Sequence, residues 1–387
     1  MKQYRLIAPV GGIGFRELFA DCLGQIQEQI DGSFRVIRIV VFVDVTEDSL
    51  LAQYRQVAGM MLEDAFREAC PAWSLLAQPP RSRHGLMCEV MGVADEAVGL
   101  LYQRFNLTPY VIVQTGHTRE LWVSGLGGHA SAMDIEASCV AAFDEMVSIL
   151  SQCQMTLNNV VRQWNYVPHI LVCEGDAVLC ERQNYQVLNE VRRHYYGLYR
   201  TIDRFPAATG IGTSAGGVTM DVCAVESDEV RVVPVDNPVQ LPPYRYSQQL
   251  LVGKPPVGAS VKQPPQFERA VMVHDGRGGV VYVSGTASIV GEQTVGVGDV
   301  VVQTQQTLQN IGQLASVRNI GDHDSSLSGF QIAPHYLRGY VKHVSDFEVV
   351  MRLCRQSYPG VPVSLVQADV CRDDLLVEIE GEFMFVR

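Results

Sequence analysis

The sequence predicts a mixed α/β (α+β) fold that consists of three tandem copies of one βαβ-type module. The first observation is a repeat: three stretches of the 387-residue chain show a helix-period segment, a charged or aromatic strand, a second helix and a final strand rich in apolar and acidic residues. The second is composition, with 47% apolar and 19% charged residues. This is ordinary for a soluble globular protein with two or three domain-sized units.

The first module has the faintest pattern. It is expected to contain a helix, a strand, a second helix that follows a Thr-Glu-Asp-Ser stretch, and closing strands, in the order 15–30, 34–45, 50–66 and 73–92. The central module repeats this order with a strand and bend at 120–126, a helix at 137–154, a strand at 160–168, a helix at 184–196 and closing strands at 205–225.

Four glycines in the last of these segments superficially suggest a phosphate loop. Their spacing fits neither G-x-x-x-x-G-K nor G-x-G-x-x-G, and no Lys-Ser/Thr follows. We interpret Gly210, Gly212, Gly216 and Gly217 as a bulged strand that a neighbour or a ligand approaches closely.

The C-terminal module has the clearest pattern. Its expected elements are a strand ending in a small-residue bend at 279–289, an amphipathic helix at 300–313, an alternating strand at 335–344, a helix with an N-cap at 345–354, a breaker at 358–360, and strands at 361–368 and 375–385. Eight prolines between 234 and 265 indicate a long linker before this module, and Tyr244 and Tyr246 favour a functional role for it. We therefore divide the chain at 1–114, 115–233, 234–265 and 266–387.

The last predicted strand carries carboxylates at alternate positions. Because side chains alternate faces along a strand, Glu378, Glu380 and Glu382 share one face. Such a row is either an exposed sheet face or a set of acids that line a cleft, where like charges raise one another's pKa when water is excluded. Surface carboxylates are the more common case.

Charge and cysteine content narrow the possible functions. A net charge of −12 without a Lys/Arg-rich run argues against nucleic acid or an acidic membrane surface as the main partner. No stretch supplies the roughly 20 apolar residues of a membrane span, and the N-terminus lacks a signal-peptide pattern, so we expect a cytoplasmic protein.

Ten scattered cysteines without a CxxC pair predict reduced, packed thiols, with neither a zinc site nor a disulfide framework. His335 and His343 lie eight residues apart without a paired acid, and no metal site is expected.

Beyond these patterns, the modules resemble the YjgF/RidA fold, and their full arrangement resembles the chorismatase family. The matching segments are residues 162–167, 185–192, 205–217, 236–238, 284–289 and 369–381. The resemblance spans roughly residues 115 to 382, whereas the first module is divergent. It implies a monomeric pseudo-trimer whose site lies between the second and third modules.

The resemblance also implies a reaction, which is cleavage of the enolpyruvyl ether of chorismate to pyruvate and a cyclic or aromatic acid, without a metal or cofactor. This chemistry needs a proton at the methylene carbon of the enol ether, and a carboxylic acid held neutral by burial and by neighbouring carboxylates can deliver it. Glu378 matches the family's acid. Glu380 and Glu382 keep the interpretation of exposed surface carboxylates.

The implied substrate carries two carboxylates, and guanidinium groups suit them. Arg192 and Arg352 match substrate-binding arginines of the family. Tyr246 matches a pocket tyrosine, and Tyr185 falls in a matching segment. Lys262 stands where the family's motif has arginine.

Two positions bear on the product. Gly285 and Cys371 match the subtype that forms 3-hydroxybenzoate, whereas the subtype that hydrolyses chorismate to a dihydroxycyclohexadiene carboxylate has alanine at both. Glycine leaves room for the ring to shift, and a thiol can exchange a proton where a methyl group cannot. A branch that releases 4-hydroxybenzoate is not separable from the first by sequence.

Two other functions compete with this one. A RidA-type imine deaminase needs an arginine in a Pro-x-Arg context, and the corresponding third residues here are Trp73, Ala208 and Ser364. A non-catalytic ligand-binding protein is also compatible with the fold, because fold does not determine function. It would tolerate the loss of Glu378.

Overall fold

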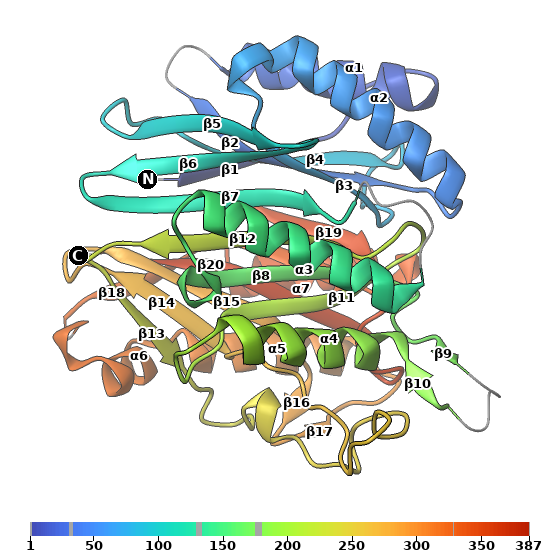
Figure 1. Ribbon diagram of the computed structural model, residues 1–387, viewed down its shortest axis with the longest axis vertical. Coiled ribbons are helices and arrows are strands. Elements are labelled where there is room, and N and C mark those ends of the chain that lie inside the picture. Colours follow the sequence, from blue (N-terminus) through green and yellow to red (C-terminus); the bar gives the residue numbers. More distant parts are fainter. Residues whose placement is uncertain (1, 31–33, 129–133, 175–179, 328, 387) are drawn as a thin grey trace.

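The computed structural model describes residues 2–30, 34–128, 134–174, 180–327 and 329–386. Three main sheets enclose a common interior, and each is covered on its outer face by its own helices (Figure 1). The predicted α+β fold is confirmed. None of the helices in these ranges is long and apolar enough to cross a membrane.

The first sheet has four strands in the order β1-β4-β2-β3. Its elements are β1 (Lys2–Ile7), α1 (Gly14–Gln29), β2 (Arg35–Val43), α2 (Asp48–Phe66), β3 (Ala72–Ala77) and β4 (Leu86–Val93). The β2 sequence is almost continuously apolar because the strand is buried on both faces, by α1 and α2 on one side and by the central interior on the other.

The second sheet has six strands in the order β11-β8-β12-β7-β6-β5. Its elements are β5 (Gly99–Phe105), β6 (Thr108–Thr115), β7 (Thr118–Leu126), α3 (Ile135–Gln152), β8 (Val160–Pro168), α4 (Asn184–Tyr199), β11 (Ala207–Thr213) and β12 (Thr219–Glu226). Asp134 caps α3 by accepting a hydrogen bond from the amide of Ala137 at 2.7 Å, which satisfies one of the free amides at the helix start.

The third sheet has six strands in the order β13-β14-β15-β20-β18-β19. Its elements are β13 (Arg231–Val235), β14 (Ala270–His274), β15 (Gly279–Ala287), α5 (Val300–Leu314), α6 (Val317–His323), β18 (Gln331–Val341), α7 (Phe347–Ser357), β19 (Val363–Gln367) and β20 (Val377–Val386). Two short hairpins complete the fold, β9 (Cys173–Glu174) with β10 (Arg182–Gln183), and β16 (Ile289–Val290) with β17 (Gln293–Thr294).

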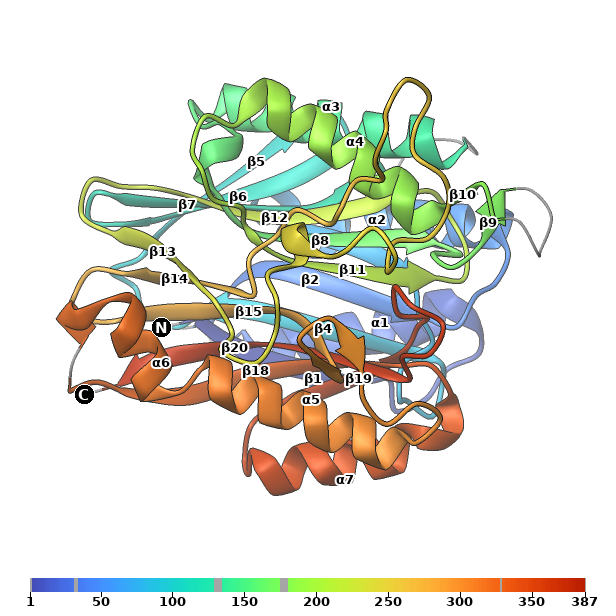
Figure 2. The same cartoon turned by 90° about the horizontal axis from the view of Figure 1, so that it is seen from below.

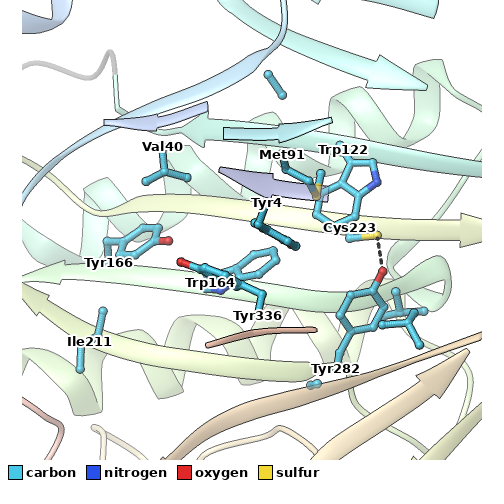
Figure 3. Packing of buried hydrophobic residues seen from close by; sticks show 14 of the residues in the cluster. Tyr4, Val40, Met91, Trp122, Trp164, Tyr166, Ile211, Cys223, Tyr282 and Tyr336 are labelled. Atoms are coloured by element: carbon cyan, nitrogen blue, oxygen red, sulfur yellow. Dashed lines mark hydrogen bonds between the residues drawn. The ribbon is translucent and has the colours of Figure 1, made fainter. Parts of the chain in front are cut away.

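One strand order recurs in all three sheets, namely β1-β4-β2-β3, β7-β12-β8-β11 and β15-β20-β18-β19. In each set the last two strands are parallel and the other neighbours are antiparallel. The inner faces meet in an aromatic-rich core to which every sheet contributes, with Tyr4 and Met91 from the first, Trp122 from the second, and Tyr282 and Tyr336 from the third (Figure 3). The three tandem repeats predicted from the sequence are thus present as three sheets of common topology.

The domain boundaries at residues 115 and 234 stay a prediction, and strands near both boundaries pair with the sheet that follows. β5 and nearly all of β6 lie before residue 115, but β5 pairs with β6, and β6 pairs with β7 of the second sheet. β13 (Arg231–Val235) crosses the boundary at residue 234 and pairs with β14 of the third sheet. After β13, the Pro-rich stretch contains one short 3-10 turn, Pro243–Arg245, and otherwise no helix or strand from residue 236 to residue 265. Figure 2 shows this stretch running between α4 and the third sheet.

The two faces of β20 differ as the alternation predicts, but the acidic face is not exposed. Val377 and Ile379 pack against the core beneath α5 and α7. Glu378, Glu380 and Glu382 retain only 5%, 3% and 5% of their accessible surface. The expectation that Glu380 and Glu382 are surface carboxylates is therefore wrong, because this face of the strand points into the interior that the three sheets enclose.

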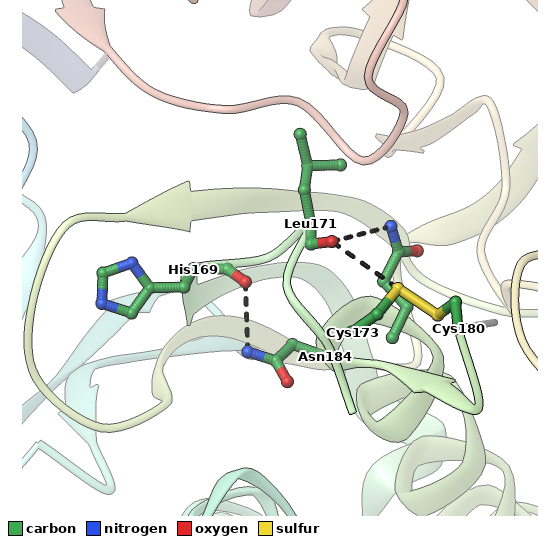
Figure 4. The surroundings of a disulfide bond; sticks show 6 residues. His169, Leu171, Cys173, Cys180 and Asn184 are labelled. Atoms are coloured by element: carbon green, nitrogen blue, oxygen red, sulfur yellow. Dashed lines mark hydrogen bonds between the residues drawn. A yellow bond between two sulfur atoms is a disulfide. The ribbon is translucent and has the colours of Figure 1, made fainter. Parts of the chain in front are cut away.

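A disulfide between Cys173 and Cys180 contradicts the expectation that all cysteines are free thiols. The β9–β10 hairpin places the two Cα atoms 5.2 Å apart, although the cysteines lie seven positions apart in the sequence without a CxxC pattern (Figure 4). Pairing depends on this folded-back geometry, which spacing alone does not reveal. The other eight cysteines are free, and seven of them are buried.

Two local predictions were wrong in part. The helix predicted at 345–354 is present as α7, but it begins at Phe347 after a 3-10 turn, and its N-cap Asp346 makes no side-chain capping bond. The glycine-rich segment is not bulged at β11, which pairs with β8 in continuous register. Close approach is present there, since a Cβ on Gly210 would lie 2.9 Å from the Tyr185 ring.

Candidate functional site

A pocket lies between the second and third sheets, at the side where the Pro-rich stretch crosses. It is lined by the start of α4, the chain between Tyr246 and Arg269, the end of β15 and the segment that leads into β20. The lining residues are Gln183, Tyr185, Gln186, Asn189, Tyr246, Leu250, Leu251, Val252, Pro265, Phe267, Arg269, Gly285, Ala287, Ile289, Cys371, Arg372, Leu375 and Glu378. Most are apolar or aromatic, with a few convergent charged groups, as in small-molecule sites.

Glu378 is the carboxyl group of this pocket. β20 holds it between Ala287 of β15 and Tyr340 of β18 in the strand register. The carboxyl group accepts no hydrogen bond from the described residues. Burial, together with the negative charge of Glu380, raises the pKa of Glu378 to about 8. At neutral pH the group is therefore a carboxylic acid that can donate a proton.

Glu380, two residues further along the same face, has the opposite environment. Its carboxylate accepts hydrogen bonds from Arg162 Nη2 at 2.7 Å, Thr209 Oγ1 at 2.5 Å and Trp164 Nε1 at 2.7 Å, and lies 3.3 Å from Arg338 Nη1. Burial acts to raise its pKa, but these cations and hydrogen bonds outweigh burial and lower it. Glu380 is thus a charged partner of Arg162.

Two arginines that the sequence interpretation missed line the pocket. Arg269 is buried, donates from Nε and Nη2 to the carbonyl of Leu241, and donates from Nη2 to the Tyr246 hydroxyl at 2.7 Å. Arg372 donates to the carbonyl of Glu292 at 2.8 Å and stacks 5.0 Å from the centre of the Tyr246 ring. No carboxylate among the described residues forms a salt bridge with either arginine. Arg372 lies inside the matching segment 369–381, where a search for cations would have found it.

Tyr185, Tyr246 and Cys371 all line the pocket, as does Gly285. Burial raises the pKa of the Tyr185 hydroxyl, and burial together with the charge of Glu378 raises the pKa of the Cys371 thiol to about 12. Both groups are therefore protonated at neutral pH and can donate hydrogen bonds.

Gly285 gives Glu378 its space. A Cβ at this position would lie 2.1 Å from Glu378 Oε1 and 3.2 Å from the Thr209 methyl carbon. The Gly285 amide donates to Thr209 Oγ1 at 3.0 Å, which ties β15 to β11 at this point. The residue is required by close packing, since its φ is not in the left-handed region.

The three other predicted site residues lie outside the pocket lining. Arg192 is buried directly behind it and donates from Nη2 to Asn189 Oδ1 at 2.5 Å; its Nε has no hydrogen-bond partner among the described residues. Lys262 donates to the carbonyl of Leu251. Arg352 is exposed on α7, and the structure does not bring it to the pocket, because α7 covers the outer face of the third sheet.

A larger cavity of about 600 Å³ lies at the opposite end of the sheets, among the β6–β7 and β14–β15 hairpins. Its main buried charges are already paired: Lys2 Nζ lies 2.5 Å from Glu120, and Glu382 accepts a hydrogen bond from the Tyr4 hydroxyl at 2.6 Å. Despite its smaller size, the pocket around Glu378 therefore has the more reactive chemistry, because it contains a neutral acid and cations without acidic partners.

Comparison with known proteins is consistent with this geometry. Residues 113–224 match the family described as chorismatase FkbO/Hyg5-like, N-terminal. A 3-hydroxybenzoate synthase of Streptomyces hygroscopicus is 32% identical over 253 residues, which are 63% of this chain and 68% of the relative. A chorismatase of Streptomyces rapamycinicus is 33% identical over 238 residues, which are 58% of this chain and 63% of the relative.

Among solved structures, a chorismatase superimposes with a TM-score of 0.70 and 22% sequence identity, covering 99% of this chain and 98% of the other. This match concerns the fold, and it extends the similarity to the first sheet, which the family profile does not reach. The sequence relatives and the family match together show that the chain belongs to the chorismatase family.

Proposed function

We propose that this protein cleaves the enolpyruvyl ether of chorismate, releasing pyruvate and 3-hydroxybenzoate. The observation that carries the proposal is Glu378, a buried carboxyl group with a pKa of about 8, set in a pocket whose arginines have no acidic partner among the described residues. An acid that is neutral at pH 7 and faces a cationic pocket suits proton donation to a dianionic substrate.

The substrate's two carboxylates would bind to Arg269 and Arg372. Both guanidinium groups reach the pocket, and each has donor hydrogens beyond those bonded to carbonyls. Arg192 adds a third positive charge behind Asn189. Arg352 and Lys262 lie outside the pocket lining, so we do not assign substrate binding to them. Tyr185 and Tyr246 line the pocket and can form hydrogen bonds with the ring substituents.

The proposed chemistry begins with transfer of the Glu378 proton to the methylene carbon of the enol ether. The electron pair of the C=C bond forms the new C–H bond, and the neighbouring carbon becomes an oxocarbenium centre. The bond between the ring carbon and the ether oxygen then breaks, and its electron pair stays on the oxygen, which becomes the carbonyl oxygen of pyruvate. The ring cation left behind gives 3-hydroxybenzoate when its hydroxyl oxygen moves to the neighbouring carbon and one proton is lost, and the Glu378 carboxylate can take this proton back. Pyruvate and 3-hydroxybenzoate together contain every atom of chorismate, so this route consumes no water, whereas the dihydroxycyclohexadiene product requires one water molecule.

Gly285 and Cys371 support the 3-hydroxybenzoate route. Both residues border Glu378, and the thiol is protonated at neutral pH, so it can donate a hydrogen bond to the substrate. One relative carries the name 3-hydroxybenzoate synthase. Hydrolysis to the diene and release of 4-hydroxybenzoate are the alternative outcomes of the test below.

Incubation with chorismate, with pyruvate followed by a coupled assay and aromatic products separated by chromatography, tests the proposal. Glu378→Gln keeps the side-chain size but cannot donate an acidic proton, so we expect pyruvate release to fall at least 100-fold. Unchanged turnover would refute the role of Glu378. Absence of pyruvate in the wild type would favour the ligand-binding alternative.

We also infer that the chain acts as a monomer, as a pseudo-trimer of modules at 1–114, 115–233 and 266–387 joined by the linker at 234–265. Support comes from the common strand order of the three sheets and from the interior they share. Light scattering should give the mass of one chain, 42.7 kDa. A mass two or three times larger would contradict this inference.

A further inference from the structure

Three buried arginines occupy equivalent places in the three sheets. Each lies on the strand that has a parallel neighbour on one side and an antiparallel neighbour on the other. The arginines are Arg38 on β2, Arg162 on β8 and Arg338 on β18. On the parallel neighbour they lie opposite Ala72, Ala207 and Ser364, respectively. On the antiparallel neighbour they lie opposite Met91, Cys223 and Glu380. The register therefore defines corresponding positions without reference to sequence similarity.

Two residues further along each of these strands, the residue directly opposite on the antiparallel neighbour is a carboxylate in every sheet. The carboxylate on the antiparallel neighbour is Glu89 opposite Val40, Asp221 opposite Trp164, and Glu378 opposite Tyr340. The proposed acid is thus the third member of a set of equivalent buried carboxylates.

The first two members of this set bind the arginine of an adjacent sheet. Arg38 of the first sheet lies 2.5 Å from Asp221 of the second. Arg338 of the third sheet donates from Nε to Glu89 of the first at 2.9 Å. By the same rule, Arg162 of the second sheet should bind Glu378 of the third.

Arg162 binds Glu380 instead, with Nη2 at 2.7 Å from Oε2. The two positions equivalent to Glu380 are occupied by Met91 and Cys223, which offer no carboxylate. Thr209 and Trp164 hold Glu380 in place through hydrogen bonds of 2.5 and 2.7 Å. The third sheet therefore differs from the other two by one additional acid, and this acid takes the arginine.

We propose that Glu380 is a positioning residue that draws Arg162 away from Glu378 and so leaves the proposed proton donor without a bonded cation. This inference rests on the proposed function of Glu378 as the acid. Glu380 does not line the pocket, so it acts through Arg162 and through its own charge.

The electrostatics agree with this geometry. The charge of Glu380 raises the pKa of Glu378, second only to burial, and the charge of Arg162 lowers it. Arg162 Nη1 is buried without a hydrogen-bond partner among the described residues, so the guanidinium has a free donor if Glu380 is neutralised. The other ionisable groups around Glu378 are Arg269, Arg372, Cys371, Tyr185 and Tyr246 in the pocket, and Tyr340 directly opposite on β18.

Glu380→Gln tests the proposal. The substitution removes a negative charge and frees Arg162, so Glu378 should lose its proton at lower pH. As pH rises, kcat/KM should fall once Glu378 loses its proton, and we expect the midpoint of this fall to lie at least one pH unit lower in the variant than in the wild type. The same shift should appear in the infrared carbonyl band of the protonated Glu378, taken as the difference between each protein and its Glu378→Gln counterpart. This second measurement does not depend on turnover.

Two control variants separate this role from mere stability. Asp221→Asn breaks the equivalent buried pair between the first and second sheets, so it should lower stability without moving either pH profile. Arg162→Met combined with Glu380→Gln removes both charges, and it should return the titration of Glu378 to within half a pH unit of the wild type.

An unmoved titration in Glu380→Gln, or a double variant that titrates like Glu380→Gln, would overturn the proposal. If Glu380→Gln does not fold, Arg162→Met decides: Glu378 should then titrate at or above the wild-type pH, and a lower value overturns the role. If no protein releases pyruvate while the infrared titration shifts as expected, the proposed function fails and the positioning role stands.

Discussion

Glu378 and Glu380 are the same residue type on the same face of one strand, yet burial acts on them with opposite outcomes. Glu380 receives two side-chain hydrogen bonds and two arginines, and its pKa is lowered. Glu378 receives none of these from the described residues, and its pKa rises to about 8. The difference is the number of donors within reach, since both side chains are almost completely buried.

The raised pKa of Glu378 predicts a pH-dependent cost in stability. A carboxyl group whose pKa is higher in the folded than in the unfolded chain contributes stability below the unfolded pKa and loses it as pH rises toward the folded pKa. Between about pH 4.5 and pH 8 the wild type should lose about 4 kcal/mol at most from this group. Glu378→Gln lacks this loss, so urea unfolding should show the variant gaining relative stability as pH rises. An equal pH dependence in both proteins would contradict the raised pKa.

Gly285 allows a second prediction at the scale of single residues. In Gly285→Ala the new methyl group would meet Glu378 Oε1 at 2.1 Å, so the carboxyl group must move. We expect pyruvate release to fall at least tenfold and the ratio of aromatic products to change. Chromatography of the reaction mixture measures both.

Gly197 offers the matched control, because it lies within α4 and a Cβ there would meet nothing within 4 Å. Gly197→Ala should leave turnover unchanged and stabilise the protein by about 0.5 to 1 kcal/mol. If Gly285→Ala behaves like this control and leaves the product ratio unchanged, the argument about product subtype is wrong.

At the scale of elements, periodicity was sufficient for most of the fold. β8 was predicted at 160–168 and occupies Val160–Pro168, and the helix predicted at 300–313 is α5. β5 and β6 were missed, because the patterns used for the modules do not include the two extra strands that extend the second sheet. The burial of Glu380 was missed because alternation identifies a face without revealing what packs against it.

The arginines show why the site was only partly predictable. Sequence comparison selected Arg352, but its position on the outer face of α7 follows from how the helix packs on the third sheet. Arg269 enters the pocket because the chain before β14 folds against Tyr246, a contact between segments that no local pattern encodes. Motif matching thus found the acid and its immediate neighbours, and tertiary packing selected the cations.

The different positions of Arg269 and Arg352 predict different effects on KM for chorismate. Arg269→Gln should raise KM for chorismate at least tenfold, because it removes a pocket cation that has no acidic partner among the described residues. Arg352→Gln changes an exposed side chain and should alter neither KM nor kcat by more than twofold. Steady-state kinetics at one pH compares the two. The reverse result would restore Arg352 as a substrate ligand and remove Arg269 from the site.

At the scale of the whole molecule, buried ion pairs join the three sheets in a closed cycle. Arg38 connects the first sheet to Asp221 of the second, Arg162 connects the second to Glu380 of the third, and Arg338 connects the third to Glu89 of the first. All six side chains are buried. A protein assembled in this way should unfold as one unit, because separating any one sheet breaks two of the three buried pairs and opens the shared interior.

Arg38→Met tests this cooperativity. Of its hydrogen bonds with the described residues, the buried Asp221 keeps those from Ser74 Oγ and the Gly125 amide but loses its cation, so we expect a loss of roughly 3 to 5 kcal/mol in the free energy of unfolding. Adding Asp221→Asn should recover part of the loss, since it removes the unpaired charge.

Arg104→Met provides the control. It breaks an exposed pair with Glu63 at 2.6 Å and should cost less than about 1 kcal/mol. Urea unfolding followed by tryptophan fluorescence and by circular dichroism should give one coincident transition in every variant. Separate transitions, or equal costs for Arg38→Met and Arg104→Met, would show that the buried cycle does not couple the three sheets.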